Sequence, residues 1–142
     1  MKPSRRSLVK SALDESAAVP HTQTVHGPLL TVVETAAFAR RAEKLLTLDE
    51  YEEMMLFLAL HPESGDEIQG TGGVRKVRFR AKGRGKSGGV RVIYYFYDKE
   101  NPVFAIFLYA KNEQVEMTPE QKRYVTAFAE SIRADARARR KT

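Results

Sequence analysis

Three segments in the second half of the chain have the period or the composition of β-strands. VRKVRFR (74–80) alternates, so that Val77 and Phe79 lie on one side of an extended chain and basic side chains on the other. VRVIYYFY (90–97) and VFAIFLYA (103–110) are rich in β-branched and aromatic residues and have the length of strands. The short connections between them predict an antiparallel meander, whose first strand has one face on a core and one cationic face.

The first half of the chain has the period of helices. LLTVV (29–33) is a short β-rich segment, and a helix is expected over residues 35–46. A second helix is expected to begin at TLDE, where Thr47 can cap it and Glu50 can return the hydrogen bond, and to end before Pro62. Together these elements predict an α+β fold, an antiparallel sheet with the two N-terminal helices on one face and the other face open.

A last helix is expected after the strands. In TPEQ, Thr118 can act as the cap and Pro119 suits the first helical position. The apolar stripe of this helix, formed by Val125, Phe128 and Ile132, indicates packing on the core, and a contact with a partner protein is the alternative.

With 142 residues the chain has room for one domain. We expect a flexible N-terminal extension over residues 1–28, a folded domain over 29–138 and a basic tail over 139–142. No apolar run is long enough to span a membrane, and no secretory signal is recognisable. The chain has no cysteine, which excludes disulfides and thiolate metal sites and fits a cytoplasmic protein. The histidines lack the spacing of metal ligands, so no metal and no cofactor are expected.

The surplus positive charge is confined to one stretch. No acidic residue occurs between Glu67 and Asp98. Removing the eight cations of this interval from the 24 Lys and Arg leaves 16, against 18 Asp and Glu. Cations that no acid relieves repel one another unless an anion binds them, so nucleic acid is the expected partner and a solubilising surface the alternative. These cations are Arg75, Lys76, Arg78, Arg80, Lys82, Arg84, Lys86 and Arg91.

The glycine-rich stretch KGRGKSGGV (82–90) imitates three phosphate-binding motifs. A P-loop requires glycine where Arg80 stands, the dinucleotide loop requires a following helix, and a kinase requires motifs that this chain lacks. We therefore interpret the stretch as a hairpin connection. Its side chains Lys82, Arg84 and Lys86 are expected to contact the phosphates of a polymer backbone.

The motifs GGVRKVRF, GGVRVIYY and YAKNE together resemble the HigB-type toxins of the RelE/ParE toxin–antitoxin superfamily, from about Leu29 to Ile132. The resemblance implies a RelE-like fold and an mRNA endonuclease that cuts message at the decoding site of the small ribosomal subunit (30S). The products would be a 2′,3′-cyclic phosphate and a 5′-hydroxyl, formed without a metal. The resemblance also implies a cognate HigA-like antitoxin with a helix-turn-helix domain.

The resemblance also assigns residues. The paired basic positions before the loop fall on Lys76 and Arg78, the arginine after it falls on Arg91, and Lys111 begins the basic cluster after the last strand; these four are the candidate catalytic residues. The candidate RNA-binding residues are Arg80, Lys82, Arg84, Lys86, Tyr95, Tyr109 and Asn112. RelE has arginine where Asn112 stands and a tyrosine where Thr118 stands, which leaves Arg91 or a lysine as the alternatives for the general acid.

The chemistry of the side chains suggests individual roles. Neighbouring cations disfavour the protonated form of Lys76, which makes it a candidate general base, and positioning RNA is the alternative. Arg91 can clamp a phosphate with two hydrogen bonds. Tyr95 shares the face of Arg91 by period two and is either a base-stacking or an ordinary cross-strand residue. Tyr109 and Lys111 are expected to close the end of the sheet near the site.

Two other functions remain compatible with the sequence. A toxin of the ParE kind has the same fold and acts on DNA gyrase without cutting RNA. The second alternative is an inactive RNA-binding relative, because Asn112 and Thr118 stand where RelE has an arginine and a tyrosine. The dense Lys and Arg on one sheet face favour the nuclease.

Overall fold

The computed structural model of the chain describes residues 29–81 and 89–140. Their order is β1 (Val32–Glu34), α2 (Ala36–Leu45), α3 (Leu48–Leu60), β2 (Asp66–Glu67), β3 (Val74–Phe79), β4 (Val90–Tyr95), β5 (Val103–Ala110) and α4 (Pro119–Arg140). The α+β class is confirmed, and the expected strands and helices are present. Predictions for residues 1–28 and for the loop 82–88 lie outside the described residues.

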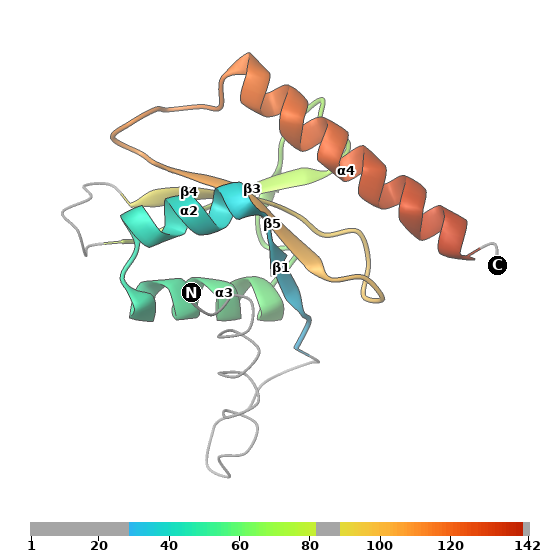
Figure 1. Cartoon of the computed structure of the whole chain (residues 1–142), viewed down its shortest axis with the longest axis horizontal. Helices are drawn as coiled ribbons and strands as arrows, with labels where there is room; N and C mark the ends of the chain where they lie inside the picture. Colours follow the sequence, from blue (N-terminus) through green and yellow to red (C-terminus); the bar gives the residue numbers. More distant parts are fainter. Residues whose placement is uncertain (1–28, 82–88, 141–142) are drawn as a thin grey trace, which may run out of the picture.

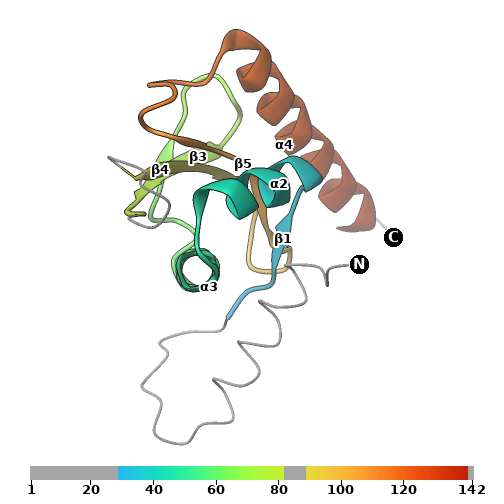
Figure 2. The same ribbon diagram turned by 60° about the vertical axis from the view of Figure 1, so that its left-hand side comes forward.

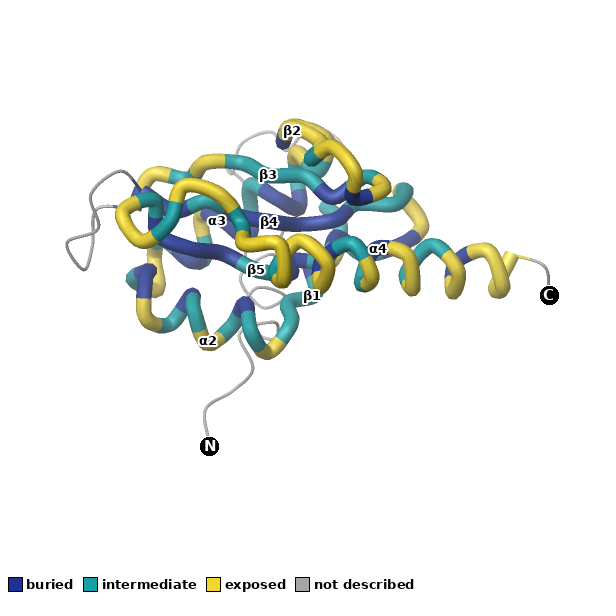
Figure 3. Tube along the Cα trace, turned by 90° about the horizontal axis from the view of Figure 1, so that it is seen from above, coloured by how far each residue is buried: buried dark blue, intermediate teal, exposed yellow. Residues whose placement is uncertain are grey.

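The strands form a five-stranded sheet in the order β1-β5-β4-β3-β2 (Figure 3). The meander β3-β4-β5 is antiparallel, as predicted, whereas β1 pairs with β5 in parallel. The two-residue β2 on the outer side of β3 was not predicted. β4 is the central strand and is buried along almost all of its length (Figure 3).

The helix starts follow the predicted capping rules. Thr47 and Glu50 form a capping box at α3, with both the side-chain and the backbone bonds present. At α4 the Gln121 N–H donates to Thr118 Oγ1 at 3.1 Å, and the Thr118 N–H donates to Gln121 Oε1 at 3.0 Å. Local hydrogen bonds thus fix both boundaries.

Helices cover both faces of the sheet, which corrects the expectation of an open second face. One cluster packs α2 and α3 on the first face through residues such as Phe38 and Leu58. The second cluster places α4 on the opposite face (Figures 1 and 2). Val125 and Ala129 of α4 belong to this cluster together with Ile93 of β4. The reason is that this face is cationic at one end only and apolar at the other.

The helix α2 completes an edge of the sheet. Because β1 is short, it pairs only with the beginning of β5. Beyond it, the Thr35 N–H donates to Ala105 O at 3.0 Å and Thr35 Oγ1 donates to Ile106 O at 2.7 Å. Arg41 Nε donates to Leu108 O at 3.3 Å. The backbone and side chain of Thr35 and the side chain of Arg41 therefore satisfy the carbonyls that a longer β1 would have paired.

The C-terminal end of α4 contacts the turn between β4 and β5. Arg139 Nη2 donates to Asn101 Oδ1 at 2.6 Å, and Asn101 Nδ2 donates to Asp98 Oδ1 at 2.6 Å. Arg140 forms an ion pair with Asp98. The helix thus continues into residues 139 and 140 of the expected tail. No helix in the described part of the chain has both the length and the apolar character that crossing a bilayer requires.

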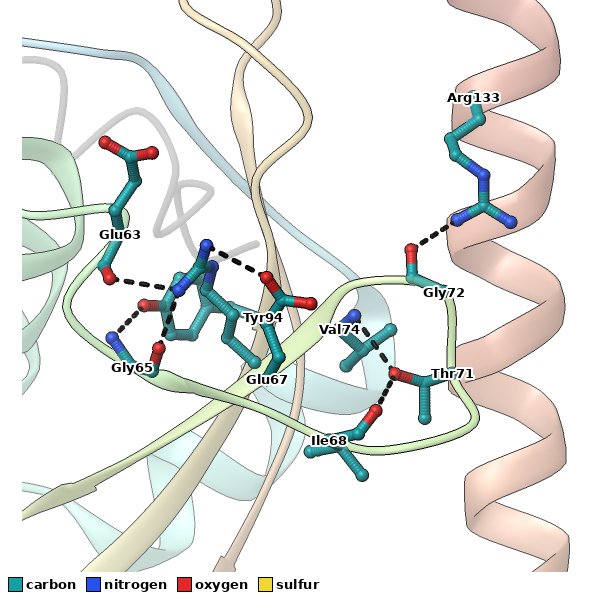
Figure 4. Close-up of polar contacts among 10 residues, drawn as sticks. Glu63, Gly65, Glu67, Ile68, Thr71, Gly72, Val74, Tyr94 and Arg133 are labelled. Atoms are coloured by element: carbon teal, nitrogen blue, oxygen red, sulfur yellow. Dashed lines mark hydrogen bonds and ion pairs between the residues drawn. The ribbon is translucent and has the colours of Figure 1, made fainter.

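The connection from α3 to β3 is attached to the sheet and to α4 (Figure 4). The buried Gly65 N–H donates to Tyr94 Oη at 2.8 Å, and a Cβ at this glycine would lie 2.7 Å from the same oxygen. Further along, Thr71 Oγ1 donates to Ile68 O at 2.7 Å, and Arg133 Nη1 donates to Gly72 O at 2.6 Å. Only glycine allows the close approach at position 65.

We predict that Tyr94→Phe lowers the free energy of unfolding by about 1–3 kcal/mol, because the buried Gly65 N–H loses its acceptor. Urea titration followed by circular dichroism measures the change. Tyr124→Phe is the control, since Tyr124 is 48% exposed, and it should have little effect. Equal stability of the Tyr94→Phe and native chains would contradict the prediction.

Candidate nucleic-acid interface

The register of the meander aligns basic side chains from neighbouring strands. Arg78 of β3 lies directly opposite Arg91 of β4, which in turn lies opposite Tyr109 of β5. Lys76 is two residues before Arg78 and therefore on the same face, opposite Ile93. Directly opposed side chains on antiparallel strands have their Cβ atoms about 4.5–5.5 Å apart. The sheet thus brings together three of the four candidate catalytic residues.

Lys111 joins this group from the turn after β5. The backbone N–H of Lys111 donates to the backbone oxygen of Gly89 at 3.0 Å, which extends the β4–β5 pairing by one residue. Gly89 has a φ of +78° and leads into β4. Desolvation, followed by the charges of Arg78, Arg91 and Lys76, lowers the pKa of the Lys111 ammonium. These charges act on it only because all four side chains are neighbours.

We define Lys76, Arg78, Arg91 and Lys111 as the basic cluster. Within residues 29–81 and 89–140, none of the four forms an ion pair with a carboxylate. Like charges directly opposed across two strands are destabilising. In addition, Nε of Arg91 is buried and has no acceptor among the described residues. A buried donor without an acceptor is costly, and an anionic ligand would satisfy both this donor and the unbalanced charge.

Arg75, another cation of the same stretch, has a different role. It alternates away from Lys76, on the face of β3 that carries Val77. Its Nη1 donates to Glu63 O at 3.0 Å and to Gly65 O at 2.7 Å, and its side chain is only 18% exposed. Arg75 therefore holds the α3–β3 connection and does not belong to the basic cluster.

The other candidate RNA-binding residues divide into three groups. Arg80 and Asn112 are exposed and adjoin the basic cluster, one after β3 and the other after Lys111. Lys82, Arg84 and Lys86 lie in the loop outside the described residues.

The tyrosines form the third group, and both are buried. Tyr95 is 3% exposed and Tyr109 is 2% exposed, in the cluster that packs under α4. Tyr109 Oη donates to Val115 O at 3.3 Å, and burial raises the pKa of this phenol. With α4 in this position neither ring is open to stack on a base, which differs from the expectation for an RNA contact. The apolar character of Ile93 between Arg91 and Tyr95 was the signal that this end of the face is core.

Sequence reasoning missed Arg41 as a neighbour of the site. This arginine of α2 forms an ion pair with Glu113, in the turn that carries Lys111 and Asn112. No local pattern could reveal it, because the two residues are 72 positions apart.

A separate cavity of about 470 Å³ lies between α2, β5 and α4. No member of the basic cluster lines it. Its walls are formed by Ala36, Ala37, Arg40, Phe107, Glu120, Gln121 and Tyr124. Nor does any group of three or more His, Cys, Asp and Glu suited to a metal ion occur in the described part of the chain.

Comparison with known proteins gives a family match over most of the chain. Residues 31–139 match the model of the RelE toxin of the RelE/RelB toxin–antitoxin system. Among solved structures, the chain is similar to a free-state double arginine-to-alanine mutant of the E. coli toxin RelE, with 17% identity and a TM-score of 0.45. That similarity covers 61% of this chain and 88% of the other. Because the family match spans the whole sheet, the basic cluster and nearly all of α4, the chain belongs to the RelE toxin family.

Proposed function

We propose that this toxin is a ribosome-dependent endoribonuclease of the HigB type, which cuts mRNA by attack of the 2′-hydroxyl on the adjacent phosphate. The observation that supports the proposal is the basic cluster, in which Arg78 and Arg91 are directly opposed and Arg91 Nε is buried without an acceptor. An RNA phosphate supplies both the negative charge and the acceptor. Cutting mRNA on the ribosome is an activity of the cytoplasm.

Three tasks have to be performed in this reaction. A group must accept the proton of the 2′-hydroxyl, another must stabilise the pentacoordinate phosphorane, and a third must protonate the leaving 5′-oxygen. The planar guanidinium groups of Arg78 and Arg91 suit the phosphorane, because each can donate two parallel hydrogen bonds to phosphate oxygens.

Lys76 and Lys111 are the two candidates for the proton acceptor. The lowered pKa of Lys111 increases its neutral fraction, and only a neutral lysine can accept a proton. We therefore favour Lys111 as the base and place Lys76 beside the phosphate. Arg80, Asn112 and the loop cations Lys82, Arg84 and Lys86 would contact flanking phosphates.

The proposed partner within the toxin–antitoxin module is a HigA-like protein with a helix-turn-helix domain. Charge supports a carboxylate-rich antitoxin segment over the basic cluster, because acidic side chains would satisfy the same donors as the RNA phosphate. Binding of this kind would exclude the message from the site.

Expression of the chain followed by mapping of the 5′ ends of cellular messages tests the function. Cuts in register with ribosomes support the proposal. DNA damage without such cuts would instead indicate a gyrase poison, and the absence of both would indicate an inactive RNA-binding relative.

We predict that Arg91→Gln lowers the rate of message cleavage roughly 100-fold, because the phosphorane loses a pre-positioned donor. Single-turnover cleavage of message on purified ribosomes measures it. The free energy of unfolding should stay equal or rise by up to about 1 kcal/mol, since a like-charge pair is relieved. Arg123→Ala on exposed α4 is the control, and an Arg91→Gln chain that cuts at the native rate would contradict the role.

We predict that Arg78→Ala raises the pKa of Lys111. A neighbouring positive charge disfavours the ammonium form, so its removal moves the pKa up toward 10.5, the usual value of a free lysine side chain. An NMR titration of the Lys111 side chain measures this without any catalysis. A rate limb that depends on neutral Lys111 should move to higher pH in the same variant. An unchanged or lower pKa would contradict the arrangement, and Arg123→Ala again serves as the control.

A further inference from the structure

The turn that carries Lys111 is closed by a side chain of its own. The Glu113 N–H donates to Ala110 O at 3.0 Å, which is an ordinary turn bond. In return, Glu113 Oε1 accepts the Ala110 N–H at 3.1 Å. The carboxylate therefore fixes the residue immediately before Lys111, from a position two residues after it.

Arg41 connects this turn to the helix α2. One of its nitrogens, Nη2, donates to the same Glu113 Oε1. Another, Nε, donates to Leu108 O at 3.3 Å, on the edge of β5 that β1 leaves unpaired. A single guanidinium thus contacts the last strand and the turn that follows it, on either side of Ala110.

Lys111 needs such support because its neighbours repel it. Arg78, Arg91 and Lys76 all act on its ammonium, and in the described part of the chain no carboxylate pairs with it. A long, unpaired side chain on a loose turn would swing away from three cations into water. A fixed turn limits the directions in which the side chain can leave the cluster.

We propose that Arg41 and Glu113 are positioning residues that hold Lys111 in the basic cluster. The inference rests on the proposed function, because it assigns them to the same reaction. Neither residue contacts the reacting atoms, and both act through the turn.

The exposure of the pair argues against a role in stability alone. The side chains of Arg41 and Glu113 are 29% and 38% exposed. Ion pairs at this level of exposure contribute little to the stability of the fold. Loss of the pair should therefore leave the fold intact and alter the turn, so its main effect is expected in the site.

A double-mutant cycle with Lys111→Ala tests the inference in the full chain. Arg41→Ala and Glu113→Ala should each lower single-turnover cleavage on ribosomes by roughly ten- to a hundredfold, since small displacements of a reacting group have effects of this size. In a Lys111→Ala background the same changes should have no further effect. An equal loss in both backgrounds would overturn the inference.

Matched variants separate position from stability. Arg40 is the exposed neighbour of Arg41 in α2, and the Arg40→Ala variant should cleave message at the native rate. Glu113→Gln keeps an acceptor for the Ala110 N–H and should retain more activity than Glu113→Ala. Loss in Glu113→Gln as large as in Glu113→Ala would overturn the part assigned to this hydrogen bond.

NMR provides a readout that does not depend on catalysis. Arg41→Ala should speed hydrogen exchange of the Ala110 amide and shift the side-chain signals of Lys111, whereas Arg40→Ala should not. If the native chain cuts no message, the proposed function fails while these signals still test the positioning. Unchanged exchange and unchanged Lys111 signals would overturn it.

Discussion

The pairing of β3 with β4 is the constraint on which the rest of the structure depends. It places Arg78 against Arg91 on one face and, by alternation, Val77 against Val92 on the other. The same register therefore buries the core under α2 and α3 and assembles the basic cluster. Since side chains alternate with period two, neither arrangement can change without the other.

The second sheet face is divided between packing and charge. Its rows run from Val74, Tyr95 and Phe104 under α4 to Arg78 and Arg91 at the far end. α4 covers the apolar rows, and its last turn contacts the β4–β5 turn through Arg139 and Arg140. The helix thus does not extend over the rows of Arg78 and Arg91, and the basic cluster lies where the helical cover ends, beside the turn after β5.

Local signals in the sequence predicted local structure well. Thr47 with Glu50 and Thr118 with Gln121 are capping pairs three residues apart, and the strand periods needed only their own residues. Contacts between distant segments were not predictable. The parallel pairing of β1 with β5, the position of α4 and the ion pair of Arg41 with Glu113 depend on tertiary packing. The alignment of Lys76, Arg78 and Arg91 could be predicted, because it follows from the alternation of side chains along a strand. The burial of Tyr95 could not be predicted from alternation, because it depends on the position of α4.

The glycine that leads into β4 has a consequence for how the loop before it can change. A Cβ on Gly89 would lie 2.5 Å from Phe79 O, and its φ of +78° is one that other residues rarely adopt. The backbone therefore enters the strand at one fixed point. The number of residues in the glycine-rich loop before Gly89 can therefore change without moving Arg91. An extra residue between Gly89 and Val90 would turn the Arg91 guanidinium toward the core and bring Val90 to the charged face, so an addition on the β4 side of Gly89 would disrupt the basic cluster.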